Sequence, residues 1–213
     1  MRRALVYRWL FFIIGLIVLA LGFSMTIKGD RLGIGPWDVL HVGLYMRFGL
    51  TIGTWAVLSG FALLLITTVF TRRMPQVGTF LNMILIGMFM DVFIFLIPDI
   101  HSLVGQALIF LGGIVVAGFG VGIYVAPKIG AGPRDSLMLL LVEKTGWGVG
   151  RVKTGVEVGA ALLGWLLGGP IGLGTVAFAL LTGKFVQISL PMFENMLKAM
   201  ILKKGELPPI LKI

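Results

Sequence analysis

One eight-residue pattern occurs twice in this chain, and the two copies lie almost half the chain length apart. Residues 33–40 and 130–137 both follow the order Gly-x-Gly-Pro-x-Asp-x-Leu. The correspondence continues in four pairs of glycines, which are Gly49 with Gly146, Gly53 with Gly150, Gly78 with Gly174 and Gly87 with Gly183. A duplicated unit in a strongly apolar chain is typical of transporters and channels built from two structural repeats.

The composition of the chain is that of a membrane protein. Hydrophobic residues make up 58% of the 213 residues, and the mean hydropathy is +1.03. Only 13% of the residues are charged, against about 25% in a typical soluble domain. No soluble domain is expected, because the last polar segment, residues 198–213, is too short to fold alone and is predicted to be a cytoplasmic tail.

The charge and the cysteine count exclude several classes of function. The formal net charge is +9, but Lys and Arg lie at the ends of apolar segments rather than on one polar face, so nucleic acid is not an expected partner. The sequence has no cysteine, which removes disulfides, thiolate metal sites and thiol catalysis. We expect no metal and no cofactor. Residues 1–28 resemble a signal peptide, but the apolar run has spanning length and no small-residue cleavage site, so it is interpreted as an uncleaved first span.

Hydropathy predicts six membrane spans, each long enough or nearly long enough to cross a hydrocarbon layer of about 30 Å. They cover residues 7–27, 52–70, 78–97, 103–125, 154–167 and 171–193. Two further helical segments, 36–47 and 133–144, would be about 18 Å long and therefore too short to cross.

The distribution of Lys and Arg predicts that both termini lie in the cytoplasm. Three spans per repeat is an odd number, so the second repeat must enter the membrane from the opposite side to the first. The predicted fold is therefore an all-α polytopic membrane protein with two inverted repeats, residues 1–98 and 103–197, each with a broken or re-entrant half-helix. If the short helices crossed, the repeats would run parallel, but their length and charges disfavour this.

The repeated motif predicts how each short helix begins. Pro36 and Pro133 suit the first helical position, where an N–H would have no partner. Asp38 and Asp135 then lie in the first turn, where a carboxylate complements the helix dipole. Two interpretations remain open: a capped helix lying on the membrane surface, or a half-helix that dips into the protein and lines a cavity.

Three ionisable residues interrupt the predicted spans and are candidates for function or buried pairing. Glu157 and Lys184 lie at similar depths and could form an ion pair between spans five and six; the alternative is that Lys184 extends to the cytoplasmic face. Asp91 has no partner at its depth, and its counterpart in the second repeat is the polar Gln187. Asp91 is therefore the residue most expected to touch a solute, a cation or a proton.

The two motif copies differ at single positions. His41 shares a helix face with Asp38, which is weak evidence for a proton-linked or metal-linked pair. Trp37 is interpreted as a membrane-interface residue. Arg134 is interpreted as a positive anchor at the inner surface, with an anion ligand as the alternative. The residues expected to bind substrate are Gly35, Asp38, His41, Asp91, Gly132, Asp135, Lys184 and Gln187. No catalytic residue is predicted, since neither the two histidines nor any carboxylate pair has catalytic spacing, and an enzyme is not expected.

The first motif also carries a family resemblance. The run Gly-Ile-Gly-Pro-Trp-Asp-Val-Leu-His at residues 33–41, with Gly-Leu at 43–44 and Gly-Leu-Thr-Ile-Gly at 49–53, resembles the YczE/YitT family of bacterial integral membrane proteins, and is closer to the YczE branch. The soluble C-terminal domain of YitT-type members has no counterpart here. The resemblance implies a protein of the bacterial plasma membrane with no firmly assigned substrate, and it implies no catalytic residues.

The function favoured by these patterns is a small-solute transporter with its site near the membrane midplane between the repeats. One repeat would move against the other in alternating access. The alternatives are a passive channel, a substrate-capture subunit of a larger importer, and an accessory membrane protein that transports nothing. The expected partners are membrane lipid and an unknown small solute or ion, and the small size of the chain is compatible with a homodimer.

Overall fold

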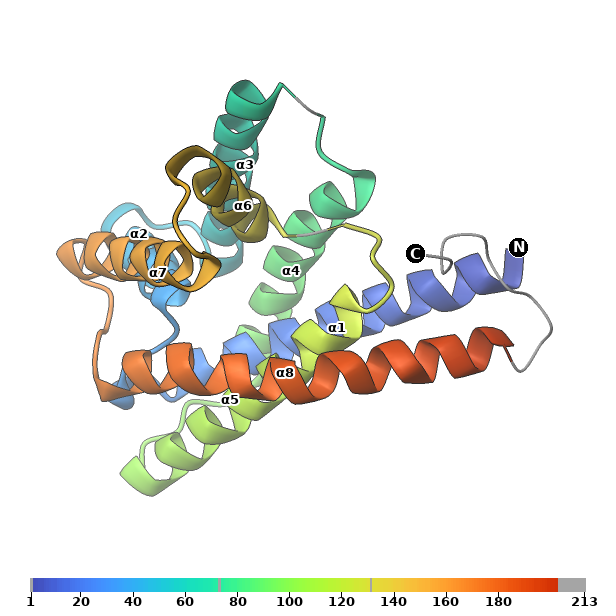
Figure 1. The fold of residues 1–213 in the computed structure, drawn as a ribbon. Helices are drawn as coiled ribbons and strands as arrows, with labels where there is room; N and C mark the ends of the chain where they lie inside the picture. Colours follow the sequence, from blue (N-terminus) through green and yellow to red (C-terminus); the bar gives the residue numbers. More distant parts are fainter. Residues whose placement is uncertain (1, 73, 131, 203–213) are drawn as a thin grey trace.

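The computed structural model describes residues 2–72, 74–130 and 132–202, which are helical apart from their connections. The helices are α1 (Arg2–Lys28), the 3-10 turn η1 (Asp30–Leu32), α2 (Pro36–Phe48), α3 (Ile52–Thr71), α4 (Val77–Leu96), α5 (Leu103–Val125), α6 (Pro133–Thr145), α7 (Val149–Leu166) and α8 (Leu173–Leu202) (Figure 1). The predicted all-α fold is confirmed for the described residues.

Helices cover all six predicted spans, and five of them are long and apolar enough to cross a membrane. The exception is α7, an 18-residue helix that carries Arg151, Lys153 and Glu157. The last helix, α8, continues past the predicted end of its span to Leu202, because Leu197 and Ile201 pack against the start of α1. The remainder of the predicted tail, residues 203–213, lies outside the described residues.

The repeated glycines explain why the two short helices have the same length. Gly49 ends α2 and Gly146 ends α6, and each adopts a positive φ (73° and 70°) that glycine accepts without strain. Their backbone N–H groups close the last turns on Tyr45 and Val142 carbonyls. The same residue at the same place in both repeats therefore stops each helix at 13 residues.

Helices α1 and α5 form the centre of the molecule and run antiparallel. Gly15 approaches Tyr124 and Gly22 approaches Ala117, so the α5 residue number falls as the α1 number rises. A Cβ built on Gly22 would lie 2.4 Å from the Ala117 nitrogen, so only glycine allows the two backbones this close. Around this pair is the main buried cluster, which includes Phe12, Leu16, Met90, Phe110 and Ile114.

Each short helix packs against a long helix from the other half of the chain. Helix α2 lies along α7, and α6 lies along α3. The first contact is tight, because a Cβ on Gly164 would lie 2.3 Å from the Leu40 nitrogen. In the second, Gly60 of α3 faces Pro133. Helices α1 and α4 pair in the same way as α5 and α8, so the two halves are interleaved rather than side by side.

The halves differ in one contact. Helices α3 and α4 pack closely, and a Cβ on Gly53 would lie 2.0 Å from the Gly87 carbonyl oxygen. Among the described residues, α7 makes no comparable contact with α8, and a Cβ on the corresponding Gly150 or Gly183 would meet nothing within 4 Å. The bundle is therefore closed between α3 and α4 and open between α7 and α8.

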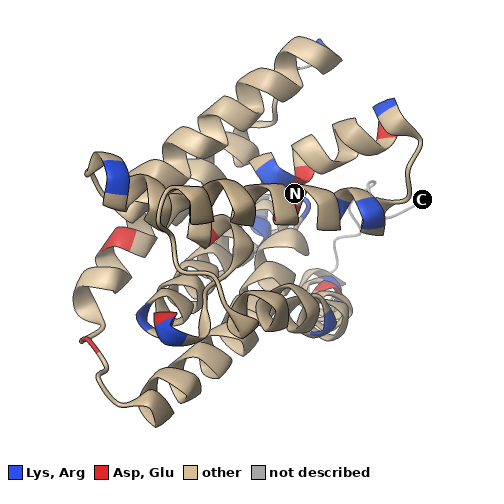
Figure 2. Cartoon of the chain, turned by 90° about the vertical axis from the view of Figure 1, so that its left-hand side faces the viewer, with Lys and Arg blue, Asp and Glu red and all other residues tan. Residues whose placement is uncertain are grey.

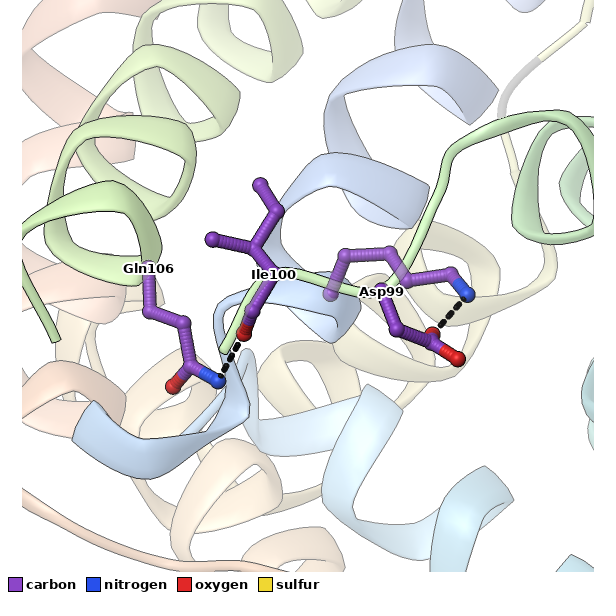
Figure 3. A network of polar contacts seen from close by, with 4 residues as sticks. Asp99, Ile100 and Gln106 are labelled. Carbon is purple, nitrogen blue, oxygen red and sulfur yellow. Dashed lines mark hydrogen bonds and ion pairs between the residues drawn. The ribbon is translucent and has the colours of Figure 1, made fainter. Parts of the chain in front are cut away.

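Polar contacts mark the two ends of the bundle. At one end, the Arg8 guanidinium donates to the Pro127 carbonyl at 2.6 and 2.9 Å. At the other end, Lys28 pairs with Asp99 at 2.5 Å, and the Gln106 side chain donates to the Ile100 carbonyl at 2.6 Å (Figure 3). The Lys28 hydrogen bond and charge lower the pKa of the exposed Asp99 carboxyl. Figure 2 shows long uncharged helical stretches between such ends, as a membrane-embedded bundle requires.

Candidate functional site

A cavity of about 440 Å³ lies at the centre of the bundle, within the usual size range for small-molecule sites. All eight α-helices contribute residues to its wall. The wall is mainly apolar and aromatic, with Phe23, Phe178 and Met83 among its members, and it includes a small group of polar and charged side chains. A mostly apolar cavity with a few converging polar groups is the usual form of a ligand site.

The two copies of the repeated motif form the starts of α2 and α6, and both starts lie in the wall of this cavity. Gly35 and Gly132 cap α2 and α6, and both line the cavity wall together with the prolines that follow them. A Cβ on Gly35 would lie 2.6 Å from the Asp38 carboxylate and 3.1 Å from Phe178. The first turn of α2 is buried within the protein, so α2 is not a helix lying on the molecular surface.

Trp37 and Arg134, which occupy the same position in the two motifs, face each other in the cavity. The Arg134 guanidinium carbon lies 4.9 Å from the Trp37 ring centroid and 5.7 Å from that of Phe23. These are cation–π distances. The interpretations of Arg134 as a surface anchor and of Trp37 as an interface residue are therefore wrong, because the N-terminal turns of α2 and α6 meet inside the protein.

Asp38 and His41 form a buried pair on the cavity side of α2. Each is only 1% exposed, and Asp38 Oδ1 lies 3.9 Å from His41 Nδ1, beyond hydrogen-bond length. Neither of these atoms has a hydrogen-bond partner, and neither does Nδ2 of the buried Asn82 on α4. Buried polar atoms without partners are rare in folded proteins and occur where a ligand or a proton completes the site.

Three further charged residues at the cavity, Lys153, Glu157 and Asp135, have polar partners within the protein. Lys153 and Glu157 lie 3.8 Å apart one turn from each other on α7, and the Tyr124 hydroxyl donates to Asp135 at 3.5 Å. The predicted ion pair between Glu157 and Lys184 does not form. Lys184 is exposed on α8 and does not line the cavity, because α7 and α8 are apart.

Asp91 also lies away from the cavity. Its carboxylate accepts a hydrogen bond from the Gly53 backbone N–H at 2.8 Å and one from the Thr51 hydroxyl at 2.6 Å. The expectation that Asp91 lacks a protein partner is wrong, since it binds the N-terminal turn of α3, where a carboxylate is favoured by unpaired N–H groups and the helix dipole. Its counterpart Gln187 does line the cavity and is exposed there.

Six of the eight predicted site residues therefore lie around one cavity, and Asp91 and Lys184 do not. In the part of the chain that the structure describes, no group of three His, Cys, Asp or Glu residues is placed to hold a metal ion. Four further cavity residues were not among the predicted site residues: Arg134, Trp37, Asn82 and Tyr124. Trp37 and Arg134 occupy the same position in the two copies of the repeated motif, and this equivalence could have indicated both.

Comparison with known proteins matches residues 6–191 to the family model described as "Family of unknown function (DUF6198)". The chain belongs to this family. It is 46% identical over 96% of its length, and over 95% of the relative, to "Uncharacterized membrane protein YczE" of Bacillus subtilis. The predicted resemblance to YczE is thereby confirmed, and the chain is a membrane protein.

Two further relatives are more distant. "Uncharacterized protein YyaS" of Bacillus subtilis is 30% identical over 88% of this chain and 94% of the relative. An "Uncharacterized protein" of Haemophilus influenzae is 34% identical over 81% of this chain and 78% of the relative. No solved structure matches. These likenesses assign a family and a membrane location but name no substrate, so the function has to be argued from the cavity.

Proposed function

We propose that this protein is a small-solute transporter of the bacterial plasma membrane that works by alternating access. The observation that carries the proposal is the meeting of both Gly-x-Gly-Pro-x-Asp helix starts at one central cavity. Broken helices whose ends converge on a cavity between two repeats are the usual architecture of a secondary transporter site. Irregular backbone within a membrane protein is tolerated where it is covered by protein or lines a cavity.

Inverted repeats account for the packing. The first helices of the two halves, α1 and α5, are antiparallel, as a two-fold axis in the membrane plane requires. The same axis exchanges the α2–α7 contact with the α6–α3 contact, and both are present. In this arrangement α7 is the fifth span, and Lys153 and Glu157 are tolerated in it because both line the cavity.

The unequal packing of the two halves corresponds to one state of a transport cycle. Here Gly53 and Gly87 hold α3 against α4, whereas Gly150 and Gly183 are apart. In the second state α7 would close on α8 through Gly150 and Gly183, and α3 would move away from α4. Gln187 would then cap α7 at Gly150 as Asp91 now caps α3 at Gly53.

The positive-inside rule gives this state a direction. Arg8, Arg72 and Lys128 lie toward the end of the bundle where α1 begins, which supports a cytoplasmic location for that end. The Gly53 contact then lies near the external end, and the open α7–α8 flank lies near the cytoplasmic end. The structure is therefore assigned to an inward-facing state.

The absence of cysteine from the chain makes the second state directly testable. In the closed α3–α4 contact the Thr51 hydroxyl lies 2.6 Å from the Asp91 carboxylate. The equivalent residues in the second half are Gly148 and Gln187, and a Cβ on Gly148 would meet nothing within 4 Å. A Gly148→Cys, Gln187→Cys double variant is expected to cross-link with a short thiol-reactive reagent when α7 closes on α8.

The two single-cysteine variants serve as controls for links between separate molecules. A cross-link within one chain that forms in membranes supports alternating access. Complete absence of the link in membranes, under energised and de-energised conditions, contradicts it and favours the passive channel or the accessory protein. A channel has no need for α7 and α8 to meet.

A further inference from the structure

The polar groups of the cavity also indicate what kind of molecule it binds, an inference that rests on the proposed transport function. We propose that the ligand is a small organic acid whose carboxylate binds Arg134 and Asn82 and whose apolar part lies against the aromatic wall. Three features of the cavity carry this assignment: an unpaired guanidinium, an unpaired amide donor, and an apolar surface around both.

The guanidinium of Arg134 is held in place without being hydrogen bonded. The ring centroids of Trp37 and Phe23 lie 4.9 and 5.7 Å from its central carbon, and none of the described residues accepts a hydrogen bond from its nitrogens. The rings provide no acceptor, so the N–H groups remain available. A free guanidinium edge matches the two oxygens of a carboxylate.

A second donor belongs to a residue in the wall of the same cavity. Asn82 is 3% exposed, and its Nδ2 has no hydrogen-bond partner. Its Oδ1 lies 3.6 Å from the position of a Cβ on Gly132, which places the amide beside the start of the helix that carries Arg134. Gly132 and Gly35 begin two helices at the cavity, and the N-terminal ends of helices favour negative charge.

The acidic groups near Arg134 do not satisfy it. Asp135 accepts from Tyr124, and Glu157 is paired with Lys153. Asp38 is turned toward His41, and its Oδ1 receives no hydrogen bond. Among the described residues no Asp or Glu forms an ion pair with the Arg134 guanidinium, which leaves it available for the negative charge of a ligand.

The rest of the wall sets the class of acid. Phe178, Met83 and Met138 line the cavity together with aliphatic residues of α3, α4 and α8. This surface would receive a hydrocarbon or aromatic group, whereas a phosphate or a highly hydroxylated molecule would leave its polar groups without partners. A monocarboxylate with an apolar body satisfies both the donors and the wall.

The test uses the purified full-length protein in detergent with probes of known chemistry. The probes are benzoate, phenylacetate and hexanoate, each with its neutral amide, together with benzylamine and inorganic phosphate. Binding is measured by the shift in unfolding temperature, since a ligand that binds only the folded state stabilises it. It is measured again by fluorescence of Trp37 in a variant whose other four tryptophans are replaced by Phe, because Trp37 lies against Arg134.

At least one carboxylate is expected to bind, with its amide at least about tenfold weaker. Arg134→Gln should weaken carboxylate binding by about tenfold or more, and Arg134→Lys should weaken it as well, because an ammonium lacks the planar fork. Lys184→Gln removes an exposed cation outside the cavity and should leave the dissociation constant within about twofold. The unfolding temperatures of the unliganded variants show whether each is folded.

Three results would overturn the assignment: equal affinity for acid and amide, binding of benzylamine or phosphate without carboxylates, or no binding of any carboxylate to the wild type. Equal losses in Arg134→Gln and Lys184→Gln would also contradict it, because a general charge effect would then explain the binding. The cross-link between positions 148 and 187 is independent of these measurements. A cross-link without carboxylate binding removes this inference alone, and carboxylate binding without a cross-link removes the transport cycle alone.

Discussion

A matched pair of glycine substitutions examines the packing difference between the two halves of the chain. Gly53 and Gly150 are equivalent positions near the start of α3 and α7. A Cβ on Gly53 would lie 2.0 Å from the Gly87 carbonyl oxygen, whereas a Cβ on Gly150 would meet nothing within 4 Å. Both residues are helical, so in each case alanine gains up to about 1 kcal/mol of helix propensity.

The two substitutions are expected to have opposite signs. In Gly53→Ala the added methyl group must push α3 away from the α4 backbone, and overpacking of this kind costs about 1–3 kcal/mol. The net effect is a destabilisation of up to about 2 kcal/mol, or more if the backbone cannot shift. Gly150→Ala has no clash, so the propensity gain remains and the protein should be stabilised by up to about 1 kcal/mol.

The assay is reversible unfolding in mixed micelles, with the unfolding temperature as a second measure. Gly155→Ala is a further control, because it lies on the same helix as Gly150 and also faces open space. Equal stability of Gly53→Ala and Gly150→Ala would refute the argument, since it would mean that the α3–α4 contact is no tighter than the α7–α8 flank. A loss of stability in Gly150→Ala would instead show that α7 is packed on α8.

Three further outcomes are expected from unfolding measurements. Asp91→Ala should lower stability by about 1 kcal/mol, because it removes the carboxylate that binds the first turn of α3. The control Lys184→Ala should leave the unfolding temperature unchanged, and similar losses in both variants would argue against the capping role of Asp91. Asp38→Asn should not lower stability, since Asp38 Oδ1 receives no hydrogen bond in the native structure, and a large loss would reveal a partner there. Lys28 lowers the native pKa of Asp99, so the small stabilisation from this pair is present above the unfolded pKa and disappears as the pH falls through the lowered native pKa. Asp99→Asn should therefore be slightly less stable than the wild type at neutral pH and equally stable in acid.

The local pattern of the sequence was sufficient to predict where the helices of the fold begin and end. Apolar length predicted six long helices, and the Pro and Gly positions predicted the two short ones within one residue at their ends. These features are encoded locally, because proline fixes a helix start and glycine accepts the positive φ that ends one. The duplication also indicated which residues are equivalent, and this equivalence brought Gly35, Gly132, Asp38 and Asp135 into the candidate site before their positions were known.

The errors concern residues whose environment depends on the packing of other helices. Asp91 looked unpaired because its partners, the Thr51 hydroxyl and the Gly53 N–H, are about forty positions away in sequence. Arg134 looked like a surface anchor because its neighbours in sequence are charged or small. Which groups are desolvated or paired is decided by contacts between distant segments, and periodicity carries no information about those contacts.

The sequence by itself determined that this chain is an apolar, cysteine-free bundle with a duplicated helix start, since length, hydropathy and backbone preference act over a few residues. Only the tertiary structure decided that the two helix starts meet at one cavity, that Arg134 lies close to the Trp37 and Phe23 rings there, and that α7 stands apart from α8. The physical reason is that equal repeats can pack unequally. Two copies of one pattern allow both the closed and the open helix pair, and the choice between them depends on the energy of the whole bundle.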